Sequence, residues 1–382
     1  MEESSPDSGG NEAREPHEGI DADGGDCNGD GGEDRSEPSE VGGSPSASGG
    51  DGGGRAGVSA KFTLGDTSEG EVFCARFSPD DLYLAAASGC GSILVYNALT
   101  GKRAFVLKCG QEDRLPTTQL RWRPQQALSK TKNVLVSVSA DGRVLHWHAS
   151  SGKCLHEIVE PDNQLFCVDY MADGSQFATA GRRREVHVYD ECTKKLAAVL
   201  SGGEEGRTPG HSNRVFSLKF HPTMRSVLVT GGWDNTLQIW DLRRGHAVRA
   251  IFGPHVCGDA VDIAQDGETI LTGSWRVDKQ LQLWDFRSER LMETIPWRTG
   301  ASLAQPCMVY AAQFSKTGTR LIAAGGSGAN EAKIFDRQGG SVVGNVLGLT
   351  RACYSVDFSN SGTMLAVAGG DGCVRIVNVN AC

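Results

Sequence analysis

Two histidines with a spacing typical of metal ligands flank a tryptophan, as His146, Trp147 and His148. On a β-strand, residues two apart point to the same face, so both imidazoles could approach one ion. A zinc site needs three or four converging ligands, and the sequence offers no third histidine nearby and no C-x-x-C pair. We therefore interpret His146 and His148 as exposed strand histidines, and the sequence predicts no metal site and no cofactor.

Two glycine-rich segments, residues 89–92 and 325–328, are the candidates for a phosphate-binding loop. Neither precedes a helical pattern or carries the Lys-Ser/Thr pair of a P-loop, and both coincide with the turn of the repeat described below. No residue is marked as a nucleophile, so we expect a protein that is not an enzyme. A hydrolase or isomerase site assembled in space is a remote alternative, because its members need not be close in sequence.

Internal repetition indicates the elements that position these residues. Residues 228–241 (LVTGGWDNTLQIWD) and 271–285 (LTGSWRVDKQLQLWD) are nearly the same, and each predicts a strand, a tight turn and a second strand. The same pattern occurs seven times along the chain. Each unit has an aromatic or apolar residue at one equivalent position: Tyr96, Trp147, Tyr189, Trp240, Trp284, Phe335 and Val377.

The fourth unit resembles the WD40 family, whose repeats of about 40 to 45 residues have a Gly-His start and a Trp-Asp finish. It carries Gly210 and His211 at its start and Trp240 and Asp241 at its end. The resemblance implies an all-β, seven-bladed β-propeller over residues 60–382. It also implies a structural tetrad, joined by hydrogen bonds, in the fourth unit: His211, Thr230, Asp234 and Trp240.

Other units depart from the family pattern. The first, third, sixth and seventh lack the Trp, and the turn carboxylate is replaced by Cys90, Arg183 and Ala329 in three of them. We expect these blades to depend on packing alone. The resemblance further implies that a strand near residues 61–64 completes the last blade and closes the ring, which removes an exposed sheet edge.

Aligning the innermost strands on their second residue predicts side chains at the rim of the central channel. In WD-repeat readers of histone tails, the segment similar to residues 210–216 supplies an aromatic ring that sandwiches a peptide arginine. We therefore expect partner binding by this ring, although such aromatics can also pack between blades and contact no ligand. The seven positions, five of them aromatic, are Phe73, Thr118, Phe166, Phe216, Asp259, Tyr310 and Tyr354.

Trp233 and Trp275 fall in the inter-strand turns of neighbouring units. Two indoles there predict an exposed apolar patch on the channel face, which is typical of a protein contact. The alternative is that each indole folds over its neighbouring blade and only shields the turn.

Basic residues are predicted on the same face, among them Arg214 and the triplet at residues 182–184, with Arg276 and Lys279. This cluster could receive an acidic or phosphorylated segment of a partner, or the acidic tail of the chain itself. A plain solvated turn is the third interpretation.

Two Trp-Asp-x-Arg boxes end at Arg243 and Arg287. They are similar to boxes in propellers that dock on the cullin-4 adaptor, and the resemblance implies that both arginines contact a ligase adaptor. The fold itself already demands Trp-Asp at these positions, so the boxes also have a purely structural explanation.

The first 59 residues carry 15 acidic residues, three arginines and 16 glycines, which predicts a disordered tail with a net charge of −12. The whole chain carries −9, so residues 60–382 carry only +3, which argues against direct nucleic-acid binding. No segment is long and apolar enough for a membrane span or has the pattern of a secretory signal. The sequence thus predicts a non-catalytic scaffold that binds other proteins or peptide segments, a monomer within a larger complex, in the cytoplasm or the nucleus.

Overall fold

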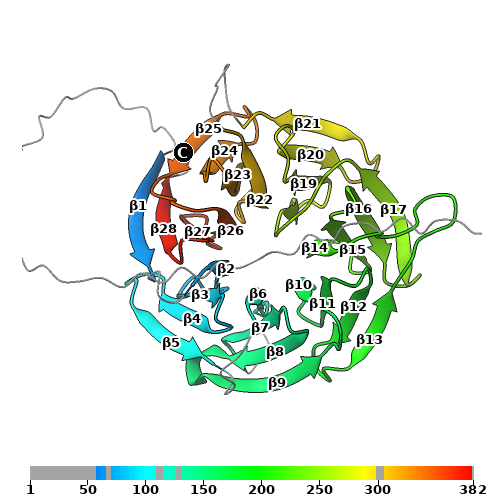
Figure 1. Ribbon diagram of the computed structural model, residues 1–382, viewed down its shortest axis with the longest axis horizontal. Coiled ribbons are helices and arrows are strands. Elements are labelled where there is room, and N and C mark those ends of the chain that lie inside the picture. The colour runs from blue at the N-terminus through cyan, green and yellow to red at the C-terminus, as the bar shows by residue number, and fades with distance from the viewer. Residues whose placement is uncertain (1–56, 66–69, 109–114, 126–130, 298–304, 381–382) are drawn as a thin grey trace, which may run out of the picture. The chain divides into compact units, whose positions relative to one another are not determined.

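Seven antiparallel sheets of four strands each form a closed ring of blades around a central channel, as Figure 1 shows. This computed structural model describes residues 57–65, 70–108, 115–125, 131–297 and 305–380. The all-β, seven-bladed propeller predicted from the sequence is confirmed. Disorder was expected for residues 1–59, and residues 1–56 of this tail lie outside the described ranges.

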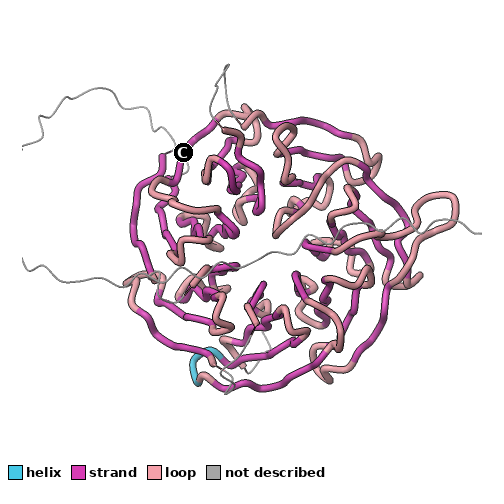
Figure 2. Tube along the Cα trace, viewed as in Figure 1, coloured by secondary structure: helices cyan, strands magenta, loops and turns pink. Residues whose placement is uncertain are grey.

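Each blade is a four-stranded antiparallel sheet whose innermost strand lies at the channel (Figure 1), and loops join the strands around the ring (Figure 2). Blade 1 contains β2 (Val72–Phe77), β3 (Tyr83–Ser88), β4 (Ile93–Asn97) and β5 (Arg103–Leu107). Blade 2 contains β6 (Thr117–Trp122), β7 (Val134–Ser139), β8 (Arg143–His148) and β9 (Lys153–Val159). Blade 3 contains β10 (Leu165–Tyr170), β11 (Gln176–Gly181), β12 (Val186–Asp190) and β13 (Leu196–Leu200). Blade 4 contains β14 (Val215–Phe220), β15 (Val227–Gly232), β16 (Thr236–Asp241) and β17 (His246–Phe252).

Blades 5 and 6 have the same order of strands, and blade 7 takes its outermost strand from the N-terminal part of the chain. Blade 5 contains β18 (Val261–Ile263), β19 (Thr269–Gly273), β20 (Leu281–Asp285) and β21 (Leu291–Ile295). Blade 6 contains β22 (Cys307–Phe314), β23 (Leu321–Gly328), β24 (Ala332–Asp336) and β25 (Val342–Val346). Blade 7 contains β26 (Cys353–Phe358), β27 (Met364–Gly369), β28 (Val374–Asn380) and β1 (Gly57–Leu64). A 3-10 turn, η2 (Ala149–Ser151), follows β8, and no helix in the described part of the chain could cross a lipid bilayer.

The N-terminal strand supplies the outer edge of the last blade. β1 pairs antiparallel with β28, from Gly57 opposite Asn380 to Leu64 opposite Val374. The pairing therefore begins three residues earlier than the boundary we assigned to the tail, and residues 57–59 belong to the closing strand.

The cores lie between neighbouring blades, where the apolar faces of two sheets meet. Trp240 of β16, for example, packs in one cluster with Val186 and Leu218 from blades 3 and 4. The seven residues that defined the repeat, from Tyr96 to Val377, are all buried. A single blade could not hide both of its faces, so the hydrophobic effect favours the complete ring.

Two interpretations from the sequence are wrong at this level. Residues 325–328 end strand β23 and do not form a turn, although residues 89–92 do. His146 is fully buried, with Nε2 3.3 Å from Glu191 Oε2 and its ring 4.9 Å from that of Phe177 in blade 3. The reason is that both faces of a propeller blade are covered, so alternation along a strand does not separate exposed from buried residues.

Candidate functional site

A β-bulge near the start of the innermost strand places one side chain at the channel in six of the seven blades; the bulged residue is the second of the strand in five of them and the fourth in blade 6. In six blades the pairing with the next strand skips this residue, as between Val72 and Cys74, which leaves Phe73 without a pairing partner. A bulge reorients the extra residue and locally increases the twist. In blade 5, Asp259 instead precedes the short strand β18. The six bulged residues are Phe73, Thr118, Phe166, Phe216, Tyr310 and Tyr354.

These side chains surround one cavity of about 330 Å³, which we call the aromatic cavity. It is lined by all seven residues predicted for the channel rim and by four more: Cys74, Gln119, Cys257 and Gly258. All seven predicted residues are half-buried. The structure thus brings every predicted position of the ring together.

The aromatic rings also pack on one another across blade boundaries. Phe166 and Phe216 stack with centroids 4.6 Å apart, and Phe73 and Tyr354 stack at 5.5 Å. Tyr310 meets Tyr354 edge to face at 5.6 Å. The two interpretations of these residues are therefore compatible, because each ring contacts a neighbour and still borders the cavity.

Trp233 and Trp275 extend this surface over blades 4 and 5. They are 37% and 38% exposed, and their rings lie 5.0 Å from Phe216 and 6.3 Å from Tyr310. The Trp233 indole donates a hydrogen bond to the sulfur of Cys257 at 2.9 Å. Burial raises the pKa of Cys257 to about 12, so the thiol stays neutral near pH 7.

The basic residues predicted on this face do not form one cluster. The Arg214 guanidinium lies 5.2 Å from the Trp233 ring, beside the aromatic cavity, and Arg276 Nη2 donates to Asn235 Oδ1 at 2.8 Å. The triplet at residues 182–184 borders a separate depression of about 890 Å³ near His211. Arg214 therefore contacts an indole ring, Arg276 contacts the turn of blade 4 through Asn235, and the triplet lies apart from both.

A second ring, which the sequence interpretation missed, lies three residues further along each innermost strand. These residues are polar in all seven blades, and we call them the charged ring: Arg76, Arg121, Asp169, Lys219, Asp262, Gln313 and Asp357. The recurrence of polar residues within otherwise apolar strands, at one position per repeat, is the signal that could have revealed it.

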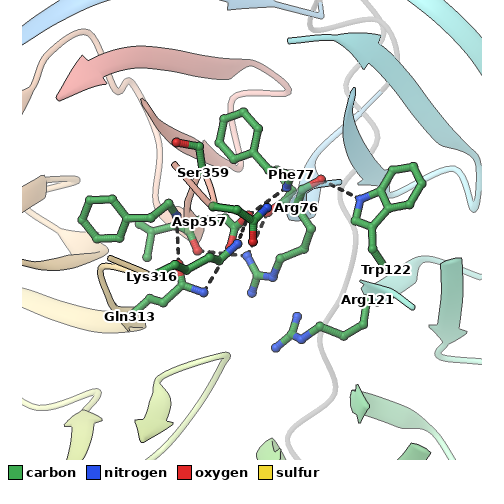
Figure 3. Close-up of polar contacts among 12 residues, drawn as sticks. Arg76, Phe77, Arg121, Trp122, Gln313, Lys316, Asp357 and Ser359 are labelled. Atoms are coloured by element: carbon green, nitrogen blue, oxygen red, sulfur yellow. Dashed lines mark hydrogen bonds and ion pairs between the residues drawn. The ribbon is translucent and has the colours of Figure 1, made fainter. Parts of the chain in front are cut away.

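The charged ring links neighbouring blades. Asp357 Oδ2 accepts a hydrogen bond from the backbone N–H of Phe77 at 2.8 Å, which joins blades 7 and 1. The other carboxylate oxygen, Asp357 Oδ1, lies 3.0 Å from both Gln313 Nε2 and Lys316 Nζ of blade 6 (Figure 3). Burial raises the pKa of Asp357, but the charges of Lys316 and Arg76 outweigh it, so the pKa lies below its usual value. In the same way, the backbone N–H of Phe220 donates to Asp169 Oδ2 and that of Phe314 donates to Asp262 Oδ2.

Asp259 crosses the channel from blade 5. Its carboxylate accepts bonds from Arg121 Nη2 at 2.8 and 3.0 Å and also pairs with Arg76 Nη2. Arg121 Nε lies 3.4 Å from Asp169 Oδ1. Asp259 lines the aromatic cavity, whereas Arg76, Arg121 and Asp169 line a second cavity.

The tetrad residues of blade 4 are in contact. His211 Nδ1 lies 2.7 Å from Asp234 Oδ2, and His211 Nε2 lies 2.6 Å from Thr230 Oγ1. The indole of Trp240 donates to the same Thr230 oxygen at 2.7 Å. Burial alone would raise the pKa of Asp234, but the hydrogen bond from His211 and the other donors have the larger effect. The net pKa is lowered, so the carboxylate stays charged.

Blade 3, which lacks the family motif, does not depend on packing alone. Glu160 is buried, and its carboxylate accepts hydrogen bonds from Tyr189 at 3.0 Å and from Thr179. His187 Nδ1 lies 2.7 Å from Glu160 Oε2, and Asn163 donates to the same oxygen at 2.8 Å. Our expectation for this blade was wrong, because a carboxylate from the preceding loop replaces the histidine of the tetrad.

The arginines of the two Trp-Asp-x-Arg boxes lie on the opposite face of the ring. They follow the ends of β16 and β20, whereas the aromatic cavity lies where the innermost strands begin. Arg243 is 77% exposed and bonds to Asp241, and Arg287 is 84% exposed. In the described ranges no group of three or more His, Cys, Asp or Glu side chains could hold a metal ion.

Comparison with known sequences supports the architecture. Residues 60–97, 203–241 and 342–378 match the family described as WD domain, G-beta repeat. The chain is 22% identical to autophagy-related protein 16 of Arabidopsis thaliana over 196 residues. The aligned region covers 51% of this chain and 35% of that protein. The chain is 26% identical over 178 residues to the guanine nucleotide-binding protein subunit beta of Zea mays, which covers 44% and 43%.

A third relative is cell division cycle 20.1, cofactor of APC complex, of Arabidopsis thaliana. The identity is 20% over 251 residues, covering 65% of this chain and 52% of the relative. The chain spans between about a third and about half of the length of these relatives.

Proposed function

Because the chain is a seven-bladed β-propeller of the WD40-repeat family, we propose that it is a non-catalytic scaffold that binds peptide segments of other proteins at the aromatic cavity. One observation carries the proposal: five aromatic side chains, at equivalent positions of different blades, border a single cavity of about 330 Å³. Ligand sites in proteins are typically concave, mostly apolar and about 300 to 1,000 Å³ in volume.

The two exposed indoles support the same proposal. Trp is enriched among the residues that contribute most to binding energy at protein interfaces. Trp233 contacts Phe216 and Trp275 contacts Tyr310, so both indoles adjoin the cavity. A peptide that enters the cavity can therefore continue over blades 4 and 5.

The relatives support protein partners in general. Two of them are named as a cofactor of a complex and as a protein subunit. We extend this to a monomeric chain that works within a larger complex, with no membrane or direct nucleic-acid contact. Location in the cytoplasm or nucleus belongs to the same proposal, and the nine free thiols among the described residues support it, because disulfides are rare in these compartments.

The experiment uses the full-length chain as bait and compares it with the double variant Phe216→Ala, Trp233→Ala. We expect the variant to lose its captured proteins, since it removes two contacting rings of the site. The matched control is Arg243→Ala, Arg287→Ala on the opposite face, which should retain them. Unchanged capture by a folded Phe216→Ala, Trp233→Ala variant would refute the proposal.

A second candidate function is that of a substrate receptor for a cullin-4 type RING ubiquitin ligase. It is favoured by the exposure of Arg243 and Arg287 on one face of adjacent blades. Co-purification with the cullin-4 adaptor, and its loss in Arg243→Ala, Arg287→Ala, would support this function. Absence of the adaptor from the purified complexes would exclude it.

A further inference from the structure

The floor of the aromatic cavity does not favour a cation. Asp259 is the single acidic residue among those that line the cavity, and it is already paired with Arg76 and Arg121. The carboxylate of Asp169 also lies beside Arg121. The two arginines and the two aspartates therefore have no net charge together. Burial first, and then the charge of Arg76, lower the pKa of Arg121, so a further buried cation beside them would be unfavourable.

Neither stacked pair of rings in the cavity wall leaves room for a guanidinium between its two rings. A planar group between two rings needs a ring separation of about 7 Å, which is twice the optimal carbon contact of ~3.5 Å. Phe166 and Phe216 are 4.6 Å apart, and Phe73 and Tyr354 are 5.5 Å apart, so these rings face each other without such a gap. The cation–π position at Trp233 is occupied by the chain's own Arg214.

The rim is basic beside the two indoles, where Arg214 and Arg276 lie, whereas Glu71 lies near Tyr354. Arg214 faces the Trp233 ring and Arg276 bonds to Asn235, and among the described residues neither arginine has a carboxylate within 4.0 Å of its guanidinium. An arginine without an acidic partner at the edge of an apolar site can bind a carboxylate in a bidentate manner. The charge of the rim is therefore complementary to an acidic residue of a ligand.

We propose that the aromatic cavity takes a neutral apolar or aromatic side chain of an extended peptide, and that Arg214, assisted by Arg276, pairs with an acidic residue of the same peptide. This inference rests on the proposed function, because it names the chemistry of the peptide that the scaffold binds. It departs from the peptide arginine that the resemblance to histone-tail readers suggested.

The test is selection of a random dodecapeptide library on the immobilised full-length protein, followed by fluorescence anisotropy with synthetic peptides. The expected peptides share a Leu, Met, Phe or Trp anchor with an Asp or Glu within a few residues. Arg214→Glu should weaken binding at least tenfold, and a peptide with Lys in place of the acid should bind Arg214→Glu better than the wild type. Arg243→Glu, on the opposite face, is the matched control and should leave binding unchanged.

Two further variants separate the possible outcomes. Thr118→Phe adds a ring at the small position of the cavity wall, so it should block binding without removing any aromatic contact. Peptides that require Phe216 but carry Arg or Lys as the anchor, or that ignore Arg214→Glu, would overturn this inference and leave the scaffold function intact. No selected peptides, or peptides indifferent to Phe216→Ala and Thr118→Phe, would overturn both.

Discussion

The phenolic oxygen of Tyr189 lies 3.0 Å from Oε1 of Glu160, and the hydroxyl of Thr179 bonds to the same carboxylate oxygen. Tyr189 occupies the position of Trp240 in blade 4, and Thr179 that of Thr230. A blade without the family motif therefore builds an equivalent polar network from other residue types. The network satisfies buried donors that would otherwise be costly.

Glu160→Ala should lower the free energy of unfolding by about 3 kcal/mol, because it leaves several buried donors without their acceptor. Urea denaturation measures the change. The matched control is Glu157→Ala, whose carboxylate pairs with Arg143 at the surface of the same strand region and should cost less than about 1 kcal/mol. Equal losses in the two variants would contradict the role of Glu160.

The pair of Glu160 and His187 makes part of the stability pH-dependent. The hydrogen bond to Glu160 raises the pKa of His187. The stabilisation from charged His187 is fully present below its unfolded pKa of about 6.5 and is lost as the pH rises through the higher folded pKa. Burial raises the pKa of Glu160, but His187 and its other donors outweigh this, so Glu160 contributes until the pH falls below about 4.5.

The measurement is the difference in unfolding free energy between the wild type and His187→Gln. We expect a larger difference near pH 5.5 than near pH 9. His187 is charged in both the folded and the unfolded chain at the lower pH, which lies below its unfolded pKa of about 6.5, and it loses its charge toward the higher pH. Burial lowers the pKa of His146, so its effect on the pH dependence of stability is opposite to that of His187. His146 is present in both proteins, so its contribution cancels in the difference. A difference that grows with pH would contradict the assignment.

Thr230→Val tests the tetrad in blade 4. The hydroxyl of Thr230 contacts both His211 Nε2 and Trp240 Nε1, so its loss should cost about 2 kcal/mol. In blade 5, the hydroxyl of Thr272 accepts a hydrogen bond from the indole of Trp284 and has no histidine partner among the described residues. Thr272→Val should therefore lower the free energy of unfolding by only about 1 kcal/mol. Thermal or urea unfolding that ranks the two variants in the reverse order would show that His211 contributes little.

Asp357→Ala tests the junction between the first and last blades. The change leaves Lys316 and the backbone N–H of Phe77 without their partner, so we expect a loss of about 3 kcal/mol or more in unfolding free energy. Asp173→Ala, at an exposed loop, is the matched control. If both variants unfold at the same urea concentration, the charged ring does not stabilise ring closure.

Part of the candidate site was predictable because its signals are local. The second position of the repeated pattern at the start of each innermost strand recurs in every unit, and all seven residues at that position line the aromatic cavity. The same alignment, read three residues further, contains the charged ring, which the sequence interpretation overlooked. The stacking of Phe166 on Phe216 was not predictable, because it depends on the separation of two blades.

The sequence by itself determined the number of blades, the strand that closes the ring and the residues that face the channel. Alternation along strands and the residues of tight turns are short-range properties, so they can be recognised in each repeat separately. Only the tertiary structure decided that Asp259 reaches Arg121, 138 positions away, and that Glu160 completes the network of blade 3. Closure of the ring brings these groups together across the channel and between sheets, and no local pattern encodes such contacts.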